Sequence, residues 1–114
     1  MKIIRTVSAL AVISMASPCQ ANDFPTSGRV EFVLECMRDH AGGQFELLNK
    51  CSCTIDRLAG HYKYDAFVEA QTMAKAVTIA GERGSALRDN NDAQKEARRY
   101  RASVLEAGRA CFLH

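Results

Sequence analysis

Four cysteines, Cys36, Cys51, Cys53 and Cys111, constrain the fold of this 114-residue chain more than any other feature. A fifth, Cys19, lies in a segment that has the pattern of a removable export signal. An even number of cysteines in a small exported chain is typical of a disulfide framework. Because a chain of this length holds one domain, we expect the four cysteines to join segments of a single core.

Residues 1–21 have the pattern of a secretory signal peptide, with a basic start, an apolar run and a small residue at the end. The apolar run is too short to cross a bilayer, which needs about 20 apolar residues. We expect cleavage after Ala21, with cleavage after Ala16 as the alternative. Lipid attachment at Cys19 is disfavoured, because Pro18 stands where lipoprotein signals carry a small residue.

Residues 22–114 are expected to form a single helical domain in an exported compartment, and the bacterial pattern of the signal indicates the periplasm. The whole chain has 15 basic and 13 acidic residues, and Lys2 and Arg5 leave with the signal, so 13 of each remain. A formal charge of zero argues against a nucleic-acid-binding protein. No later stretch is apolar enough to be a membrane span.

The spacing of the cysteines narrows their pairing. Cys51 and Cys53 are two residues apart, and on a helix this offset points their side chains about 200° apart. Each is therefore expected to pair with a cysteine on another segment. Two connectivities remain, namely 36–51 with 53–111 and 36–53 with 51–111.

A hairpin turn at Gly42-Gly43 would favour the first connectivity. Residues at equal distances from this turn lie level with each other, which places Cys36 opposite residue 49 and nearer to Cys51 than to Cys53. The second connectivity stays open, because Cys51 lies on the apolar stripe of its own segment and could reach a core-facing Cys111.

The rival interpretation of the cysteines is a thiol-redox or metal site. Cys51-Ser52-Cys53 could hold Cu(I) or Zn, with His40 one turn after Cys36, and with His61 and His114 as further ligands. Such thiolate sites need reduced cysteines, which an exported compartment oxidises. A thioredoxin-type site would need Cys-x-x-Cys near a βαβ pattern, and neither is present. Structural disulfides are the preferred hypothesis.

Apolar residues recur at helical spacing through the chain after residue 27, and no segment alternates as a half-buried strand does. The sequence therefore predicts an all-α domain of four mostly antiparallel helices joined by short links. The first is expected to start at Ser27 or Gly28 and to end before Gly42, and the next two to cover 44–59 and 66–80. The last is expected to follow Asp92 and to run to about Ala107. Asp65 and Asp92 are the expected N-caps of the last two helices.

The first predicted helix has one apolar face, which we expect to point into the core. Its members follow the i, i+3, i+4, i+7, i+11 pattern and are Val30, Val33, Leu34, Met37 and Ala41.

The last predicted helix carries a cluster of basic residues, Lys95, Arg98, Arg99 and Arg101, which is a candidate surface for an acidic protein partner. The plainer interpretation is a solvated helix face that Glu96 and Asp92 partly balance.

Two other segments have a functional and a structural interpretation. Gly81-Glu82-Arg83-Gly84 lacks the spacing of a phosphate loop and reads as a turn before a polar loop over residues 85–91. A site formed by Glu82 with Arg88-Asp89 is the functional alternative. Tyr62 and Tyr64 could make a recognition surface, or could cover the edge of the helical core.

Several segments resemble a group of small exported bacterial proteins of unknown function, over residues 36–112. The group has a Cys-x-Cys helix, a Tyr-Asp-x-Phe helix start and a C-terminal Cys-Phe. Here these are Glu46–Asp56, Tyr64–Ala70 and Cys111-Phe112, and Gly81–Gly84 is a further segment that resembles the group. The resemblance implies an association with gene neighbourhoods of quinoprotein (PQQ-dependent) alcohol dehydrogenases, and it implies no catalytic residue.

Taken together, these patterns predict a non-enzymatic, disulfide-stabilised helical protein of the periplasm with a binding or accessory role. Nothing in the chain singles out a nucleophile, and no catalytic residue or cofactor is predicted. The alternative is a thiol-redox or Cu/Zn-binding protein that uses Cys51 and Cys53.

Overall fold

The computed structural model describes residues 22–114, and every regular element in this range is a helix. The predicted all-α class is therefore confirmed, whereas the predicted signal segment and Cys19 lie outside the described residues. The five helices are α1 Thr26–Asp39, α2 Gln44–His61, α3 Tyr64–Ala76, α4 Glu82–Arg88 and α5 Asn91–Ala110.

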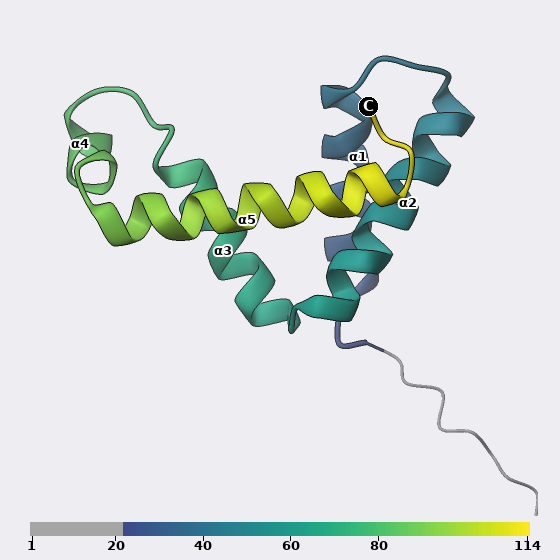
Figure 1. Cartoon of the computed structure of the whole chain (residues 1–114), viewed down its shortest axis with the longest axis horizontal. Coiled ribbons are helices and arrows are strands. Elements are labelled where there is room, and N and C mark those ends of the chain that lie inside the picture. The colour runs from purple at the N-terminus through teal and green to yellow at the C-terminus, as the bar shows by residue number, and fades with distance from the viewer. Residues whose placement is uncertain (1–21) are drawn as a thin grey trace, which may run out of the picture.

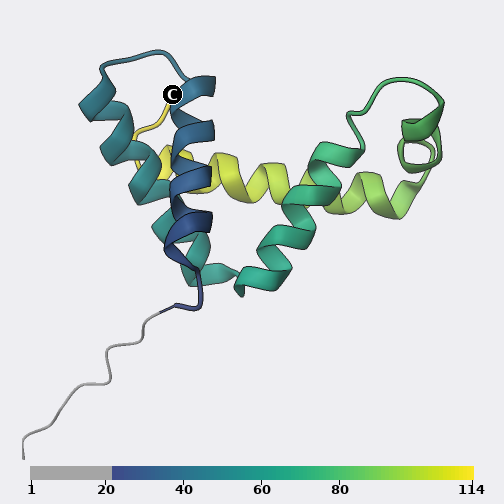
Figure 2. The ribbon, with the colours of Figure 1, turned by 180° about the vertical axis from the view of Figure 1, so that it is seen from behind.

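The longest helix, α5, lies across the others (Figure 1). The helices α1 and α2 form a hairpin at the C-terminal end of α5. Helix α3 crosses α5 nearer its middle, and α4 lies at the start of α5 (Figure 2). Helix α5 contacts α2, α3 and α4, while α1 contacts chiefly α2. The chain thus has a hairpin and a crossing helix, where the sequence predicts four mostly antiparallel helices.

The predicted loop over residues 85–91 is wrong, because helix α4 occupies its first part. Gly81 adopts a φ of 87°, which reverses the chain after α3. Arg88 then fastens the reversal, because its guanidinium donates to the carbonyl of Ile79 and, at 3.0 Å, to that of Gly81. A Cβ at Gly84 would overlap the Ile79 carbonyl oxygen, so a glycine is needed where α4 folds back.

The predicted N-cap of α3 is also wrong. Lys63 holds the N-cap position and has no capping hydrogen bond, while Asp65 lies within the first turn. Asp23 takes over the role from a distance, since both of its carboxylate oxygens lie 3.1 Å from the Tyr64 amide nitrogen, which donates to them. The segment before α1 therefore stabilises the start of α3.

The N-cap of α5 is Asn90, two residues before the predicted Asp92. The Asn90 Oδ1 accepts hydrogen bonds from the amides of Asp92 at 2.9 Å and Ala93 at 3.0 Å. Asp92 lies in the first turn of α5, where its negative charge interacts favourably with the helix dipole.

Helix α2 forms the centre of the core. Its Cys51, Thr54, Ile55 and Leu58 are all at most 1% exposed. Phe67 of α3 packs beside them, and four aromatic rings surround it with centroid distances between 5.1 and 6.2 Å. These rings belong to Phe24, Phe32, Tyr62 and Tyr100. Tyr62 and Tyr64 lie at the edge of this core, which is the structural interpretation of the pair.

Helix α1 buries a different face from the predicted one. Phe32, Val33 and Cys36 point inward, whereas Val30 is 50% and Leu34 62% exposed. Cys36 must face α2 to reach Cys51, and Phe32 lies one turn before it on the same side, against Phe67. The disulfide and the aromatic contact thus set the rotation of α1, and only Val33 of the predicted face is buried.

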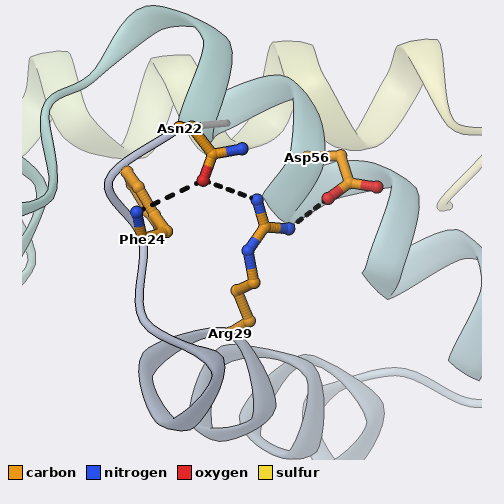
Figure 3. Close-up of polar contacts among 4 residues, drawn as sticks. All are labelled: Asn22, Phe24, Arg29 and Asp56. Atoms are coloured by element: carbon orange, nitrogen blue, oxygen red, sulfur yellow. Dashed lines mark hydrogen bonds and ion pairs between the residues drawn. The ribbon is translucent and has the colours of Figure 1, made fainter. Parts of the chain in front are cut away.

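The segment before α1 is fastened by Arg29 (Figure 3). The Asn22 Oδ1 accepts from the Phe24 amide at 3.2 Å and from Arg29 Nη2 at 2.7 Å. The other end of the guanidinium pairs with Asp56 of α2. These contacts hold Phe24 in the core, where it is 6% exposed.

Candidate functional site

Two disulfides join α2 to both of its neighbours. Cys36–Cys51 links α1 to α2 with a Cα–Cα distance of 5.9 Å, and Cys53–Cys111 links α2 to the end of α5 at 5.8 Å. This is the connectivity that the Gly42-Gly43 hairpin favours. Two disulfides also fit an oxidising compartment outside the cytoplasm.

The residues of the rival metal hypothesis do not come together. Cys51 and Cys53 bond to different segments, and their sulfur atoms are not thiolates in this state. The Nδ1 atom of His40 lies 2.8 Å from the Cys36 carbonyl oxygen, within hydrogen-bond distance. His61 and His114 are exposed at other places on the surface. Within residues 22–114, no three His, Cys, Asp or Glu side chains are placed to hold a metal ion.

A groove of about 410 Å³ lies between α1, α3 and α5. Its volume is within the range of ligand-binding pockets. Most of the lining surface is apolar, and the apolar side chains there include Phe32, Cys36, Ala74, Val104, Leu105 and Leu113. Polar side chains also line it and include Glu35, Asp39, His40, Gln71, Lys75 and Arg101. We call this feature the central groove.

The central groove exists because α1 and α3 both rest against other helices more than against each other. The Lys75 ammonium of α3 donates to Glu35 of α1 at 2.9 Å and links the two walls. The Lys75 side chain is 59% exposed, so this pair contributes at most about 1 kcal/mol. The walls are therefore joined by a weak polar contact at the solvent edge.

Tyr100 lies at the bottom of the central groove and is 8% exposed. Burial, with a smaller effect from the nearby Glu35 carboxylate, raises the pKa of Tyr100 well above its ordinary value. The phenol is therefore protonated at neutral pH. It can form hydrogen bonds to a bound group, but it cannot act there as a base.

The predicted basic cluster divides between two places on α5. Lys95, Arg98 and Arg99 are exposed, and Arg99 pairs with Glu96 one turn away at 3.1 Å. Arg101 instead lines the central groove, where its guanidinium donates to the Ala74 carbonyl at 3.1 Å. The four residues do not form one surface, and only Arg101 belongs to the groove.

The end of α5 closes one side of the central groove with a Schellman motif. The amides of Leu113 and Phe112 donate to the carbonyls of Gly108 at 2.9 Å and Arg109 at 3.1 Å. This fold-back requires Phe112 to adopt a φ of 59°, although it is not a glycine. The Leu113 side chain packs over Gly108, where a Cβ would meet it at 3.5 Å.

The alternative site at Glu82, Arg88 and Asp89 is not assembled. The Arg88 guanidinium is committed to the carbonyls of Ile79 and Gly81. Its role in the structure is to hold α4 against the end of α3.

Most of the central groove has no signal in the sequence. Glu35 and Lys75 are 40 residues apart, and each has the ordinary appearance of a solvated helix residue. Gln71 and Leu105 likewise carry no motif. Sequence patterns single out only Cys36, His40 and Arg101 among the lining residues as candidate functional residues, and they do so for other reasons.

None of the helices in residues 22–114 is both long and apolar enough to cross a membrane. Comparison of the chain with protein-family models, curated proteins and solved structures finds no match.

Proposed function

We propose that this protein is a non-enzymatic binding protein of the periplasm, which holds an apolar segment of a partner protein in the central groove. The observation that carries the proposal is the groove itself, whose lining surface is mostly apolar and is bordered by polar side chains. This composition is typical of sites that bury an apolar ligand and orient it through a few hydrogen bonds. An amphipathic helix is the partner element that such a groove between helices suits best.

The scaffold supports a binding role. Both disulfides connect α2 to the helices that carry the groove walls and floor, so Cys36 and Leu113 keep their places in the lining. A preformed groove lowers the entropic cost of binding. The thiol or metal function is not proposed, because its cysteines already form these links.

The polar rim supplies the means of selecting a partner. Arg101 donates from one nitrogen to the Ala74 carbonyl, and its other N–H groups can donate to a carboxylate or a carbonyl of the bound segment. Tyr100 offers a protonated hydroxyl nearby in the lining. The resemblance to exported proteins near quinoprotein genes makes the components of a quinoprotein alcohol dehydrogenase system the first partners to test.

Site-specific photo-cross-linking tests this function. A photoreactive residue in place of Leu105, which lines the groove, should form an adduct with one partner in cells of the natural host. The same residue in place of Val68, an exposed apolar position on α3 outside the groove lining, is the matched control. A competing Leu105→Glu protein should fail to displace the partner, while Val68→Glu should displace it. Equal adducts from both positions, or none from Leu105, would contradict the proposal.

A further inference from the structure

We propose that a second copy of this chain covers an exposed apolar stripe on the outer face of the α1–α2 hairpin and forms an antiparallel homodimer. The stripe consists of Val30, Leu34 and the half-buried Met37 on α1 with Leu48 on α2, and Phe45 lies one turn before Leu48. This surface is separate from the central groove, so the inference does not depend on the proposed function.

The stripe is unusually apolar for a surface exposed to water. Val30 is 50%, Leu34 62%, Phe45 81% and Leu48 41% exposed. A shallow hollow of about 320 Å³ runs between α1 and α2 here, and its lining includes Val30, Leu34, Met37 and Leu48. Contiguous apolar patches of this kind mark interaction surfaces.

Helix α1 is apolar on two sides, and the single chain buries only one of them. Phe32, Val33 and Cys36 face the core, whereas Val30 and Leu34 face water. A helix that is apolar on most of its circumference is normally buried on most of it. A helix from outside the single chain that packs on the second apolar side would explain why this side is apolar.

An identical hairpin is the occupant that fits this face. Two helical hairpins that pack through their apolar faces complete a four-helix arrangement, and a two-fold axis makes one stripe complementary to itself. A two-fold axis near Leu34 places α1 antiparallel to α1 of the second copy. Val30 of each chain then lies near Met37 of the other.

Charges beside the stripe select the antiparallel orientation. Glu31 and Arg38 are both exposed, and they lie seven residues apart on the same flank of α1. Their midpoint falls beside Leu34, so a two-fold axis there brings each Glu31 opposite Arg38 of the second copy. A parallel two-fold arrangement would instead place the Glu31 and Arg38 residues of the two copies on opposite flanks of the interface, where they would form no such pairs.

The size of the face sets the expected strength. Helix α1 has 14 residues and is about 21 Å long, so two helices offer a face at the small end of specific interfaces. We expect a reversible dimer with a Kd of roughly micromolar order, which forms as the concentration rises.

Sedimentation velocity of residues 22–114 in the oxidised state, from about 1 µM to 1 mM as suits this range, tests the dimer. The wild-type chain should shift from monomer to dimer, and Leu34→Glu should stay monomeric while circular dichroism shows its helices intact. Lys95→Glu, on the exposed side of α5, is the surface control and should behave as wild type. A wild-type chain that remains a monomer throughout overturns the proposal.

Charge reversal tests the orientation and does not rely on a core-like residue. Glu31→Arg and Arg38→Glu should each weaken the dimer about tenfold, because each places like charges opposite each other twice. The double variant with both substitutions should recover the wild-type Kd to within about threefold. A double variant weaker than both single variants would overturn the antiparallel pairing.

Discussion

Removal of the Cys53–Cys111 disulfide should destabilise this domain by about 4 kcal/mol, chiefly through the unfolded chain. The link closes a loop of 58 residues, and the chain-entropy relation gives about 4 kcal/mol for that length. The 15-residue loop of Cys36–Cys51 gives about 3 kcal/mol by the same relation. A domain of this size has a free energy of unfolding of only about 5–14 kcal/mol, so either loss is large.

Urea denaturation of Cys53→Ala/Cys111→Ala and Cys36→Ala/Cys51→Ala at constant pH measures both effects. Cys51 is fully buried, so the second variant also loses packing, and the total loss of the two variants should be similar. The denaturant m-value separates them. Release of the long loop lets the unfolded chain expand and should raise m clearly, whereas release of the short loop should change it little.

The result that would refute this reasoning is specific. If the Cys53→Ala/Cys111→Ala variant loses less than about 1 kcal/mol and keeps the wild-type m-value, the long link does not restrict the unfolded chain. The end of α5 would then be held in place by helix packing alone.

Three further perturbations have expected outcomes that equilibrium unfolding can check. Gly60→Ala should stabilise the fold by about 0.5–1 kcal/mol, because a Cβ at this helical position would meet no other atom. Gly28→Ala should destabilise it by about 1–3 kcal/mol, because a Cβ there would lie 2.7 Å from the Tyr64 ring. Equal effects of the two substitutions on the free energy of unfolding would contradict this. Phe112→Gly should be more stable than Phe112→Ala by about 0.5–1 kcal/mol, because only glycine adopts the φ of 59° without strain, and the opposite order would show an unstrained backbone. The raised folded-state pKa of Tyr100 means that the folded state holds its proton more tightly, so the free energy of unfolding should fall as pH rises above the ordinary pKa of 10. A Tyr100→Phe protein should lose that part of the alkaline slope, and an unchanged slope would argue that the phenol is solvated.

Helix α2 shows what a sequence of this kind specifies locally. Its apolar residues are three and four apart throughout, and the helix runs over Gln44–His61 where 44–59 is predicted. The Gly42-Gly43 turn lies between α1 and α2, and it gives the level at which Cys36 meets Cys51. In each case the information is contained within about twenty residues.

The features that depend on distant contacts could not be predicted in this way. Asp23 caps α3 across 41 residues, and the sequence around Asp65 offers a local cap that the chain does not use. Helix α4 depends on Arg88 reaching back to the end of α3. The apolar spacing of α1 describes two faces, and this spacing alone does not tell which of them meets the core. The disulfide from Cys36 to α2 decides it.

The central groove follows from how α2 and α5 are connected. Disulfides attach α2 to α1 on one side and to the end of α5 on the other, while α3 is held by its packing against α5. Helices α1 and α3 consequently need no extensive contact with each other, and the Glu35–Lys75 pair is enough to link their edges. A small domain without these covalent links would have to close that space with side chains to reach the same stability. In the proposed function the cysteines therefore have an indirect role, because they stabilise a core that leaves one of its internal faces open.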